Sequence, residues 1–592
     1  MIYQDLRLKY QDIFLRLERK ASRIASLRLL VALLVLFSFY QLTQTGYFLW
    51  LIIALVGTAV FAYLVRVYQS LSREQRIVEG LVAVNHNEIQ FLEQNEGPFD
   101  PGTELQPETH FYAYDLDILG KNSLFQYLNR TATWPGKTAL ANMLLHSLTN
   151  PDAILARQQA VRELAPKLDW RQRLLAVAAL KKDDARATTN LLRWADQPAI
   201  PVPLFFKILA WVLPAALFGS LIVGMATGNS TWAQIASGIF AVNLSVLGLF
   251  FKKIQGEIAA FDEVHVQLRQ YGLLVENMEN EPFESPLLRD IVAQLHTNTS
   301  KASTEILYLS NLFNRLDSIA NLMVVLLFDG LFLFHVHQLD TLQRWKKRFA
   351  HHIPQWLNAI GQMEALSSLA NFAHNNPDFA YPTLNAQHRI YFEELGHPLL
   401  RREKRVCNTV EFDQPRFVVL TGSNMSGKST FLRSLGVNLV LAGTGAPVCA
   451  RVAQVHPLPL LVSMRLNDSL SDSESYFFAE VKRLSEIVDF ATRQRTFVLL
   501  DEILRGTNSD DKRMGTVGVL KKMVELQAIG AIATHDIEVC NTTLEHPDSL
   551  MNKCFEVNIV NNEALSFDYV LRDGVCQNKS ASFLMRKMKI IA

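Results

Sequence analysis

The residues best suited to chemistry lie in one short stretch, Val418-Val-Leu-Thr-Gly-Ser-Asn-Met-Ser-Gly-Lys-Ser-Thr430. Its pattern predicts a buried strand, a glycine-bounded loop and the start of a helix. Gly422 and Gly427 let the backbone curl so that N–H groups face a phosphate, and Lys428 reaches the β- and γ-phosphates. The Ser429 hydroxyl is suited to Mg²⁺, and the dipole of the following helix attracts the anion. The stretch therefore predicts a nucleotide site made by Gly422, Ser423, Asn424, Met425, Ser426, Gly427, Lys428, Ser429 and Thr430.

Two further strands carry groups that phosphate hydrolysis needs. Phe497-Val-Leu-Leu-Asp501-Glu502 is an apolar strand that ends in two carboxylates. Asp501 is placed to hold Mg²⁺, largely through water, and Glu502 is placed to polarise the attacking water. Ile529-Gly-Ala-Ile-Ala-Thr-His535 is another buried strand, which delivers a histidine to the same edge of the sheet. In this order the pieces predict ATP hydrolysis, with Glu502, His535 and Lys428 as catalytic residues and Ser429 and Asp501 as metal ligands.

Four segments resemble the ATPase domain of the MutS family of DNA mismatch-repair proteins. They are residues 421–433, Ser475-Tyr-Phe-Phe-Ala-Glu480, residues 500–509 and Ala533-Thr-His535. The Asn-Met inside the loop and the Arg-Gly-Thr after the acidic pair separate this group from transporter-type ATPases. Residues 114–152 and 356–370 resemble parts of the MutS helical core. The resemblance implies an α/β P-loop NTPase domain of the ABC/MutS type, preceded by an all-α core and lever domain.

The same resemblance implies a homodimer that uses ATP and Mg²⁺. In the family, the segment that resembles residues 475–480 completes the partner subunit's nucleotide site, so Ser475 is assigned to nucleotide binding. Where the family places an aromatic residue to stack on adenine, this chain has Arg405-Val-Cys-Asn408. Arg405, through its planar guanidinium, and Asn408 are therefore the expected contacts near the base. The core and lever helices imply a clamp that closes on DNA when ATP binds.

The composition indicates membrane segments. The 592 residues are 49% hydrophobic with a mean hydropathy of +0.10, which is high for a soluble chain of this size. Apolar runs at 29–40 and 47–65 predict one helical hairpin, and runs at 205–227 and 232–251 predict a second. A hairpin buried in a soluble core is the alternative. The formal net charge of +1 gives no overall attraction to nucleic acid. The five cysteines have no metal-like spacing and indicate thiols in a reducing compartment.

The basic residues that flank both hairpins define their orientation. They include residues 7–28, Arg66 and Lys252-Lys253, and the positive-inside rule places them in the cytoplasm. We therefore expect a multi-pass protein of the cytoplasmic membrane, with four transmembrane helices and its ATPase domain in the cytoplasm. A third apolar run, 319–334, contains Asp329, and a charged residue in a span is costly. For this run we predict a buried core helix, with a fifth membrane-embedded helix as the alternative.

These observations divide the chain into three domains. Residues 1–70 are a basic segment and transmembrane hairpin, standing where MutS has its mismatch-recognition domain. Residues 71–395 are the helical core and lever domain, interrupted by the second hairpin at about 205–251, and residues 396–592 are the ATPase domain. The expected function is a membrane-anchored MutS-type ATPase that binds mismatched or structured DNA through its helical core in an ATP-gated dimer. The alternative is a membrane-embedded ABC-like motor, or an ATP-gated scaffold, that does not bind DNA.

Overall fold

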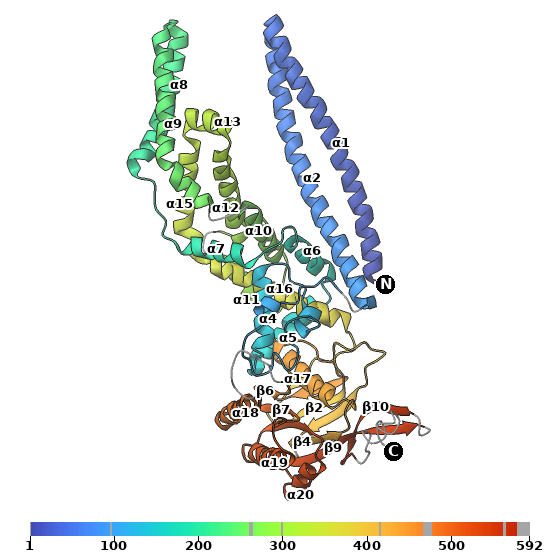
Figure 1. Cartoon of the computed structure of the whole chain (residues 1–592). Coiled ribbons are helices and arrows are strands. Elements are labelled where there is room, and N and C mark those ends of the chain that lie inside the picture. Colours follow the sequence, from blue (N-terminus) through green and yellow to red (C-terminus); the bar gives the residue numbers. More distant parts are fainter. Residues whose placement is uncertain are drawn as a thin grey trace.

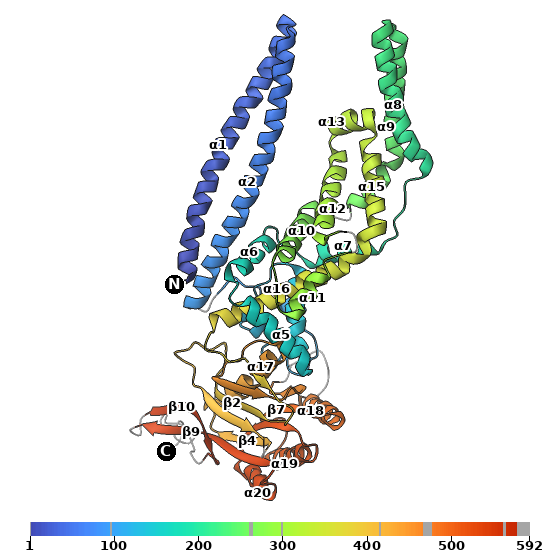
Figure 2. The same cartoon turned by 180° about the vertical axis from the view of Figure 1, so that it is seen from behind.

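The computed structural model describes residues 2–94, 97–259, 264–297, 300–413, 416–465, 476–560 and 564–576. The molecule is elongated, with an α/β domain at one end, a helical body in the middle and two helical hairpins at the other end (Figure 1). The opposite view shows that the two hairpins leave separate parts of the helical body and point the same way (Figure 2).

The first hairpin consists of two very long helices, α1 (Ile2–Thr45) and α2 (Phe48–Gln94). The chain turns between them at Gly46, whose φ of 65° is in the left-handed region that glycine adopts freely. Each helix runs without a break from its polar part into its apolar part. Close packing holds the pair together, because a side chain at Gly57 would collide with Val35. The predicted apolar hairpin is therefore the outer half of a longer two-helix rod.

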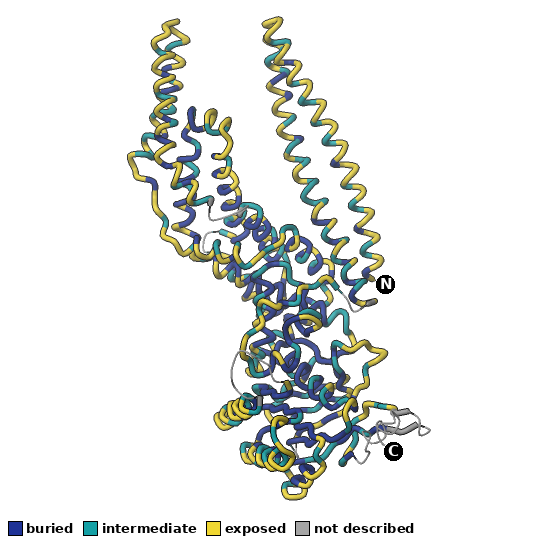
Figure 3. The backbone as a smooth tube through the Cα atoms, viewed as in Figure 1, coloured by how far each residue is buried: buried dark blue, intermediate teal, exposed yellow. Residues whose placement is uncertain are grey.

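The second hairpin is formed by α8 (Leu204–Thr227) and α9 (Ser230–Ala259). These two helices, together with α1 and α2, are long and apolar enough to cross a membrane. In the most apolar window of each helix only 6% to 28% of the residues are buried. Figure 3 shows the exposed surface along the outer parts of both hairpins. In the described residues these windows are therefore not buried in a core of this chain, which speaks against the alternative of a hairpin buried in a soluble core.

The helical body surrounds α16 (Ile353–Asn375), which is buried along most of its length. Glycine allows the closest approach to it, since a side chain at Gly361 would meet the backbone of Pro135 at the start of α4. The other helices of the body are α3 (Leu124–Leu128), α4 (Trp134–Leu145), α5 (Pro151–Leu164), α6 (Leu168–Ala178), α7 (Ala185–Asp196), α10 (Val264–Asn280), α11 (Pro286–Ala293), α12 (Ala302–Asp317) and α15 (Phe334–Phe349).

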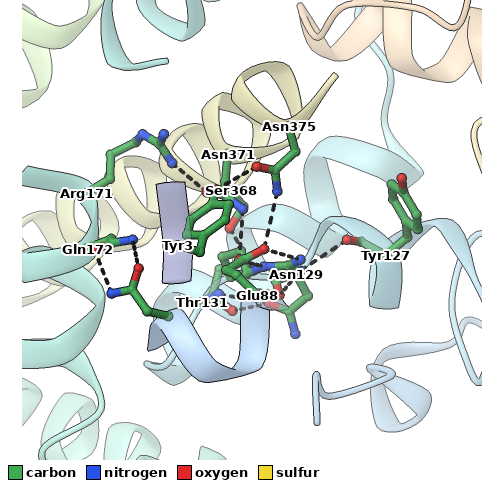
Figure 4. A network of polar contacts seen from close by, with 12 residues as sticks. Tyr3, Glu88, Tyr127, Asn129, Thr131, Arg171, Gln172, Ser368, Asn371 and Asn375 are labelled. Atoms are coloured by element: carbon green, nitrogen blue, oxygen red, sulfur yellow. Dashed lines mark hydrogen bonds and ion pairs between the residues drawn. The ribbon is translucent and has the colours of Figure 1, made fainter. Parts of the chain in front are cut away.

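A buried polar network joins the base of the first hairpin to the helical body (Figure 4). Tyr3 of α1 donates to Asn375 of α16 over 2.6 Å, and Arg171 of α6 donates to Asn371 over 2.8 Å. Glu88 of α2 pairs with Arg130 and accepts from Asn371 over 3.0 Å. Buried polar groups are stable only when they are satisfied in this way. The network fixes the hairpin to the same helix that leads into the α/β domain.

The third apolar run corrects the sequence prediction. Residues 319–334 do not form a buried core helix. They break into a 3₁₀ turn (Ser318–Ala320), α13 (Leu322–Val324), a π-helical turn (Val325–Asp329) and α14 (Gly330–Phe332). Most of their large apolar side chains are exposed. The pieces on either side of the break at Leu333 are bent by 84°. The polar Asp329 is buried inside this bend, which a straight helix would not allow.

The α/β domain contains two sheets in the described part of the chain. The larger sheet has the strand order β10-β9-β4-β8-β7-β6, and only the β9–β10 pair is antiparallel. Its strands are β4 (Phe417–Gly422), β6 (Leu460–Ser463), β7 (Phe497–Asp501), β8 (Ile529–Thr534), β9 (Leu550–Val560) and β10 (Ala564–Asp573). The smaller sheet has the order β1-β5-β2-β3, with β1 (Thr383–Leu384), β2 (Ile390–Leu395), β3 (Asn408–Phe412) and β5 (Val452–Val455).

The larger sheet determines where the predicted site residues meet. Every residue of β4, β7 and β8 is buried, as expected for parallel strands covered on both faces. The covering helices are α17 (Lys428–Thr444), α18 (Tyr476–Arg493), α19 (Ser509–Glu525) and α20 (Thr542–Glu545). Thr421 of β4 pairs with Thr534 of β8, and Ala533 of β8 pairs with Asp501 of β7. The carboxyl ends of the three strands therefore lie side by side.

Candidate nucleotide-binding site

The loop between β4 and α17 has the shape of a phosphate cradle. Gly427 has a φ of 104° and directly precedes the first residue of α17. A side chain at Gly422 would collide with the Ser426 hydroxyl and the Phe555 carbonyl, so only glycine fits there. The Lys428 ammonium donates to the carbonyls of Gly422 and Ser423 over 2.7 and 3.1 Å. Burial lowers the pKa of Lys428. The loop therefore holds its lysine folded back over the N-terminus of a helix.

Ser429 and Asp501, the two predicted metal ligands, lie in contact with each other. The Ser429 hydroxyl donates to Asp501 Oδ2 over 2.5 Å. Burial raises the pKa of Asp501. Within the described residues, Asp501 Oδ1 and the hydroxyls of Ser423 and Ser426 are buried without a hydrogen-bond partner. Buried polar atoms of this kind are costly unless a ligand or ion satisfies them. The hydroxyl and carboxylate oxygens suit Mg²⁺, and the two serine hydroxyls can also donate to phosphate.

Glu502 and His535 form a second pair beside the loop. Glu502 has a φ of 49°, a strained conformation that directs the carboxylate out of the strand end. Its Oε1 accepts from His535 Nε2, and His535 Nδ1 lies 3.0 Å from the carbonyl of Gly422. His535 Nδ1 also lies 3.5 Å from the Lys428 ammonium, so the imidazole joins Glu502 to the phosphate loop. The hydrogen bond from His535 lowers the pKa of Glu502 to about 2.

A pocket of about 660 Å³ opens over the loop. Lys428, Ser429 and Glu502 line its inner part, and Asn424, Met425 and Thr430 lie exposed at its mouth. Tyr569, Lys404, Val406 and Phe431 also line it. Tyr569 projects from β10 against Gly427 and was not predicted as a site residue. It follows the P-loop by more than a hundred residues, and no local sequence pattern connects the two.

The structure corrects the expected role of Arg405. Its guanidinium donates to the Leu400 carbonyl over 2.7 Å and lies over the ring of Phe379, and Arg405 is not among the residues that line the pocket. Asn408 does line the pocket, but its side chain is occupied by the backbone of β10. It donates to the carbonyl of Tyr569 over 3.0 Å and accepts from the N–H of Leu571 over 2.7 Å. Asn408 therefore holds Tyr569 in place.

Ser475 lies outside the described residues. The helix that follows it, α18, is described and carries Glu480, which is buried. The Glu480 carboxylate accepts from the N–H groups of Leu504 and Arg505 over 2.7 and 3.0 Å. These residues follow the acidic pair after Ile503. Glu480 therefore ties α18 to the loop that carries Glu502, a role that the sequence analysis did not assign to it.

The fold and the site together define a P-loop nucleotide-binding protein. Comparison with known families gives two matches: the family model for MutS domain V matches residues 418–589, and that for MutS domain III matches residues 113–373. The second match begins after the first hairpin and spans the α8–α9 hairpin. The chain belongs to the MutS family.

Individual relatives match over part of the chain. The human MutS protein homolog 4 is 28% identical over 225 residues, which cover 36% of this chain and 24% of that protein. The DNA mismatch repair protein MSH6 of Arabidopsis thaliana is 31% identical over 257 residues, covering 40% and 19%. The DNA mismatch repair protein MutS of Clostridium kluyveri is 29% identical over 230 residues, covering 37% and 26%. The matched region thus spans about a quarter or less of each relative.

Proposed function

We propose that this protein is a membrane-anchored ATPase of the MutS type, which binds and hydrolyses ATP with Mg²⁺ in the cytoplasm. One observation carries the ATPase proposal: the Ser429–Asp501 and Glu502–His535 pairs meet at the end of a P-loop whose buried polar atoms lack partners. Membership of the MutS family supports the same conclusion. Unpartnered buried polar atoms occur elsewhere in the described residues too, but those of Asp501, Ser423 and Ser426 gather at this one loop.

Each residue has a defined task in the proposed reaction. The N–H groups of the loop and the Lys428 ammonium bind the phosphates, and Ser429 and Asp501 would hold Mg²⁺, which neutralises charge on the phosphates. Glu502 orients the attacking water. A carboxylate with a pKa near 2 is a poor proton acceptor. Glu502 must therefore be released from His535 before it acts as a base, and we assign that release to nucleotide binding.

The ATPase assignment is tested with two variants. Glu502→Gln keeps the loop intact, so it should bind ATP with unchanged affinity and lower the hydrolysis rate by about 10²–10⁴. Lys428→Ala removes the phosphate contact and should weaken binding itself. The measurements are ATP affinity at equilibrium and single-turnover hydrolysis. Equal loss of affinity in the two variants would contradict these roles.

The apolar hairpins support the membrane part of the proposal. All four helices are long enough to cross a bilayer core of about 30 Å. Their outer surfaces are exposed apolar side chains, which water disfavours and lipid does not. The basic residues lie at the inner ends of the hairpins, which by the positive-inside rule puts the α/β domain in the cytoplasm.

The membrane proposal is tested by extraction and labelling. The protein should stay in the membrane through carbonate and high-salt washes and leave it only with detergent. Single cysteines placed in the loops at 41–46 and 228–231 should react with an impermeant reagent from outside, and tags at both termini should be reached only from inside. Release by carbonate alone would instead mean that some other protein covers the apolar surfaces.

The proposed partners are a second copy of the chain and DNA. Both are implied by the family, and two of the relatives compared above are named DNA mismatch repair proteins. A second candidate is an ATP-driven membrane motor or scaffold that does not bind DNA. One observation favours it: the end of the helical body farthest from the ATPase carries the apolar hairpin α8–α9.

The two candidates are separated by crosslinking in intact membranes. Ultraviolet crosslinking followed by purification in detergent should recover nucleic acid from the wild-type protein if DNA is the partner. Recovery should depend on ATP and should be lost in Lys428→Ala. Recovery of no nucleic acid with either protein would favour the motor or scaffold. Equal amounts with both proteins would mean that the contact with nucleic acid is not gated by ATP.

A further inference from the structure

The bend between α12 and α15 ends in an apolar tip, which we define as residues 322–332. Its large exposed side chains are Leu322, Met323, Leu326, Leu327, Phe328 and Phe332, with Leu322 69% exposed. Only Asp329 in the tip is charged, and the flanking charges are Asp317 on α12 and Asp340 on α15. An exposed group of this kind at the end of a helical arm requires an apolar environment.

The one carboxylate in the tip is enclosed and paired. Asp329 and His335 are both 0% exposed. The Asp329 carboxylate lies 2.5 Å from His335 Nδ1 and accepts the His335 backbone N–H over 2.8 Å, while His335 Nε2 lies 3.1 Å from the Ser318 hydroxyl. The pair caps α15 at the point where Leu333, with a φ of 51°, reverses the chain. The tip therefore presents no unpaired charge.

The tip packs against the second hairpin. A side chain at Gly330 would collide with the ring of Phe240 in α9, and the Gly330 carbonyl accepts from Asn243 over 2.8 Å. The rings of Phe332 and Phe218 of α8 lie 5.4 Å apart. Irregular backbone is tolerated at membrane depth only where protein satisfies it. These contacts supply that condition on the side facing α8 and α9.

The same contacts give the depth of the tip. Lys207, near the start of α8, pairs with Asp340 of α15 over 2.8 Å, so these two charges mark a common level at the water boundary. Phe218 lies about 16 Å beyond Lys207 along α8, taking the rise of an α-helix. Phe240 lies about 15 Å from Ser230 at the far end of α9. Against a hydrocarbon core of about 30 Å, the tip reaches roughly the middle of the bilayer.

We propose that residues 322–332 form a re-entrant element, which enters the acyl chains of the cytoplasmic leaflet beside α8 and α9 and returns to the cytoplasm. The proposal rests on the membrane position of the hairpins proposed above. The Asp329–His335 pair is the clip that makes entry possible, because it closes the bend and removes an unpaired charge from the lipid. The ATPase thus touches the membrane through an element of its lever arm as well as through its spans.

Depth is measured with single cysteines in a background that carries Cys407→Ser, Cys407 being the one exposed cysteine. A fluorophore is attached at Leu327 in the tip, at Ile222 in α8 and at Tyr308 on α12, and the full chain is reconstituted in vesicles that contain nitroxide-labelled phosphatidylcholine. Leu327 should be quenched to about the same extent as Ile222, and Tyr308 should not be quenched. Quenching at Ile222 without quenching at Leu327 overturns the tip proposal alone and indicates a soluble partner or second copy. Absence of quenching at both positions overturns the membrane proposal.

The return of the chain to the cytoplasmic side is tested with cysteines at Asn314 on α12 and Arg344 on α15. Both should react with an impermeant maleimide from the cytoplasmic side, opposite to the loop at 41–46. Reaction from opposite sides would make the run a fifth span and overturn the re-entrant assignment.

The clip is tested by a pair of variants. His335→Ala leaves Asp329 buried without its partner and should reduce quenching at Leu327, while Ile222 stays quenched. Asp329→Asn combined with His335→Ala removes the charge as well and should restore quenching. If the double variant stays as poorly quenched as the single one, the clip serves the fold of the bend and not its entry into lipid.

Discussion

Tyr569 is an aromatic residue of the pocket that the sequence did not predict. The contact near the base was expected from Arg405 and Asn408. Tyr569 lines the pocket, its backbone is held by Asn408, and its ring lies against Gly427 of the loop. Arg405 instead turns to the carbonyl of Leu400. The contrast allows the two residues to be separated by experiment.

Tyr569→Ala should weaken ATP binding about two- to twelvefold, because an aromatic contact contributes about 0.5–1.5 kcal/mol beyond its buried area. Arg405→Ala should leave the affinity unchanged. The measurement is equilibrium titration with a fluorescent ATP analogue in detergent, and Tyr569→Phe is the matched control, since it keeps the ring. A loss of affinity with Arg405→Ala as large as with Tyr569→Ala would restore Arg405 to the site.

At this scale the sequence predicted those site residues that end a strand or begin a helix. Asp501, Glu502 and His535 follow apolar strands, and parallel strands bring their carboxyl ends to one edge. The roles of Tyr569 and Glu480 depend on contacts between segments far apart in the chain. The hydrogen bond from the Arg405 guanidinium to the Leu400 carbonyl cannot be predicted from any sequence pattern.

Among the elements, α16 carries an unusual group, the fully buried Glu364. Its carboxylate accepts from the N–H groups of Ala132 and Thr133 and from the Thr133 hydroxyl. Burial raises the pKa of Glu364 to about 7. The folded protein therefore keeps this proton over a pH range in which the unfolded chain, with an ordinary glutamate pKa of 4.5, has lost it. Stability from this group is complete below the ordinary pKa and is lost as the pH rises through 7.

Glu364→Gln should remove the loss of folding stability that the wild type shows as the pH rises. Between about pH 5 and about pH 8 the free energy of unfolding of the wild type should fall relative to the variant by an amount on the order of 3 kcal/mol. The thermal midpoint of the wild type should fall with it. The measurement is thermal unfolding in detergent across this range. Glu79→Gln, at an exposed position on α2, is the control and should run parallel to the wild type. A parallel course for Glu364→Gln would mean that the carboxyl is already ionised in the folded state.

The sequence predicted the existence of the long helices better than their limits. Apolar runs mark the outer halves of α1 and α2. The polar halves are amphipathic or helical in period, but the sequence does not show that each helix continues without a break. The prediction of a buried core helix at 319–334 was wrong for a different reason. Its composition suits a core helix, and the break depends on Asp329 and His335 pairing across six positions, which periodicity does not report.

For the whole molecule, the central question is whether two chains share a nucleotide site. Ser475 precedes α18, and Glu480 of α18 holds the loop after Glu502, so a contact at the start of this helix would reach the chain's own acidic pair. Free N–H groups and the helix dipole at such an end favour an anion. In the proposed dimer, the partner's γ-phosphate would supply that anion.

Ser475→Arg should block hydrolysis and leave binding at each chain's own P-loop intact, because the larger side chain obstructs only the partner's phosphate. Mixing it with Lys428→Ala chains should restore at most one working site per dimer. The measurements are hydrolysis rate, nucleotide affinity and mass in detergent with and without ATP. Hydrolysis by a monomer at a rate that Ser475→Arg does not change would exclude a shared site.

The contact at the base of the first hairpin relates rotation of α16 to displacement of the far end of α1. Tyr3 lies within the first turn of α1, and its hydroxyl is bonded to Asn375 at the last turn of α16, next to the start of the α/β domain. With 44 residues, α1 is a stiff rod about 66 Å long. A tilt of about 5° at its base displaces its far end by about 6 Å, by the geometry of a straight helix. Small rotations of α16 would thus be magnified at the far end of the hairpin, which the membrane proposal puts at the opposite face of the bilayer.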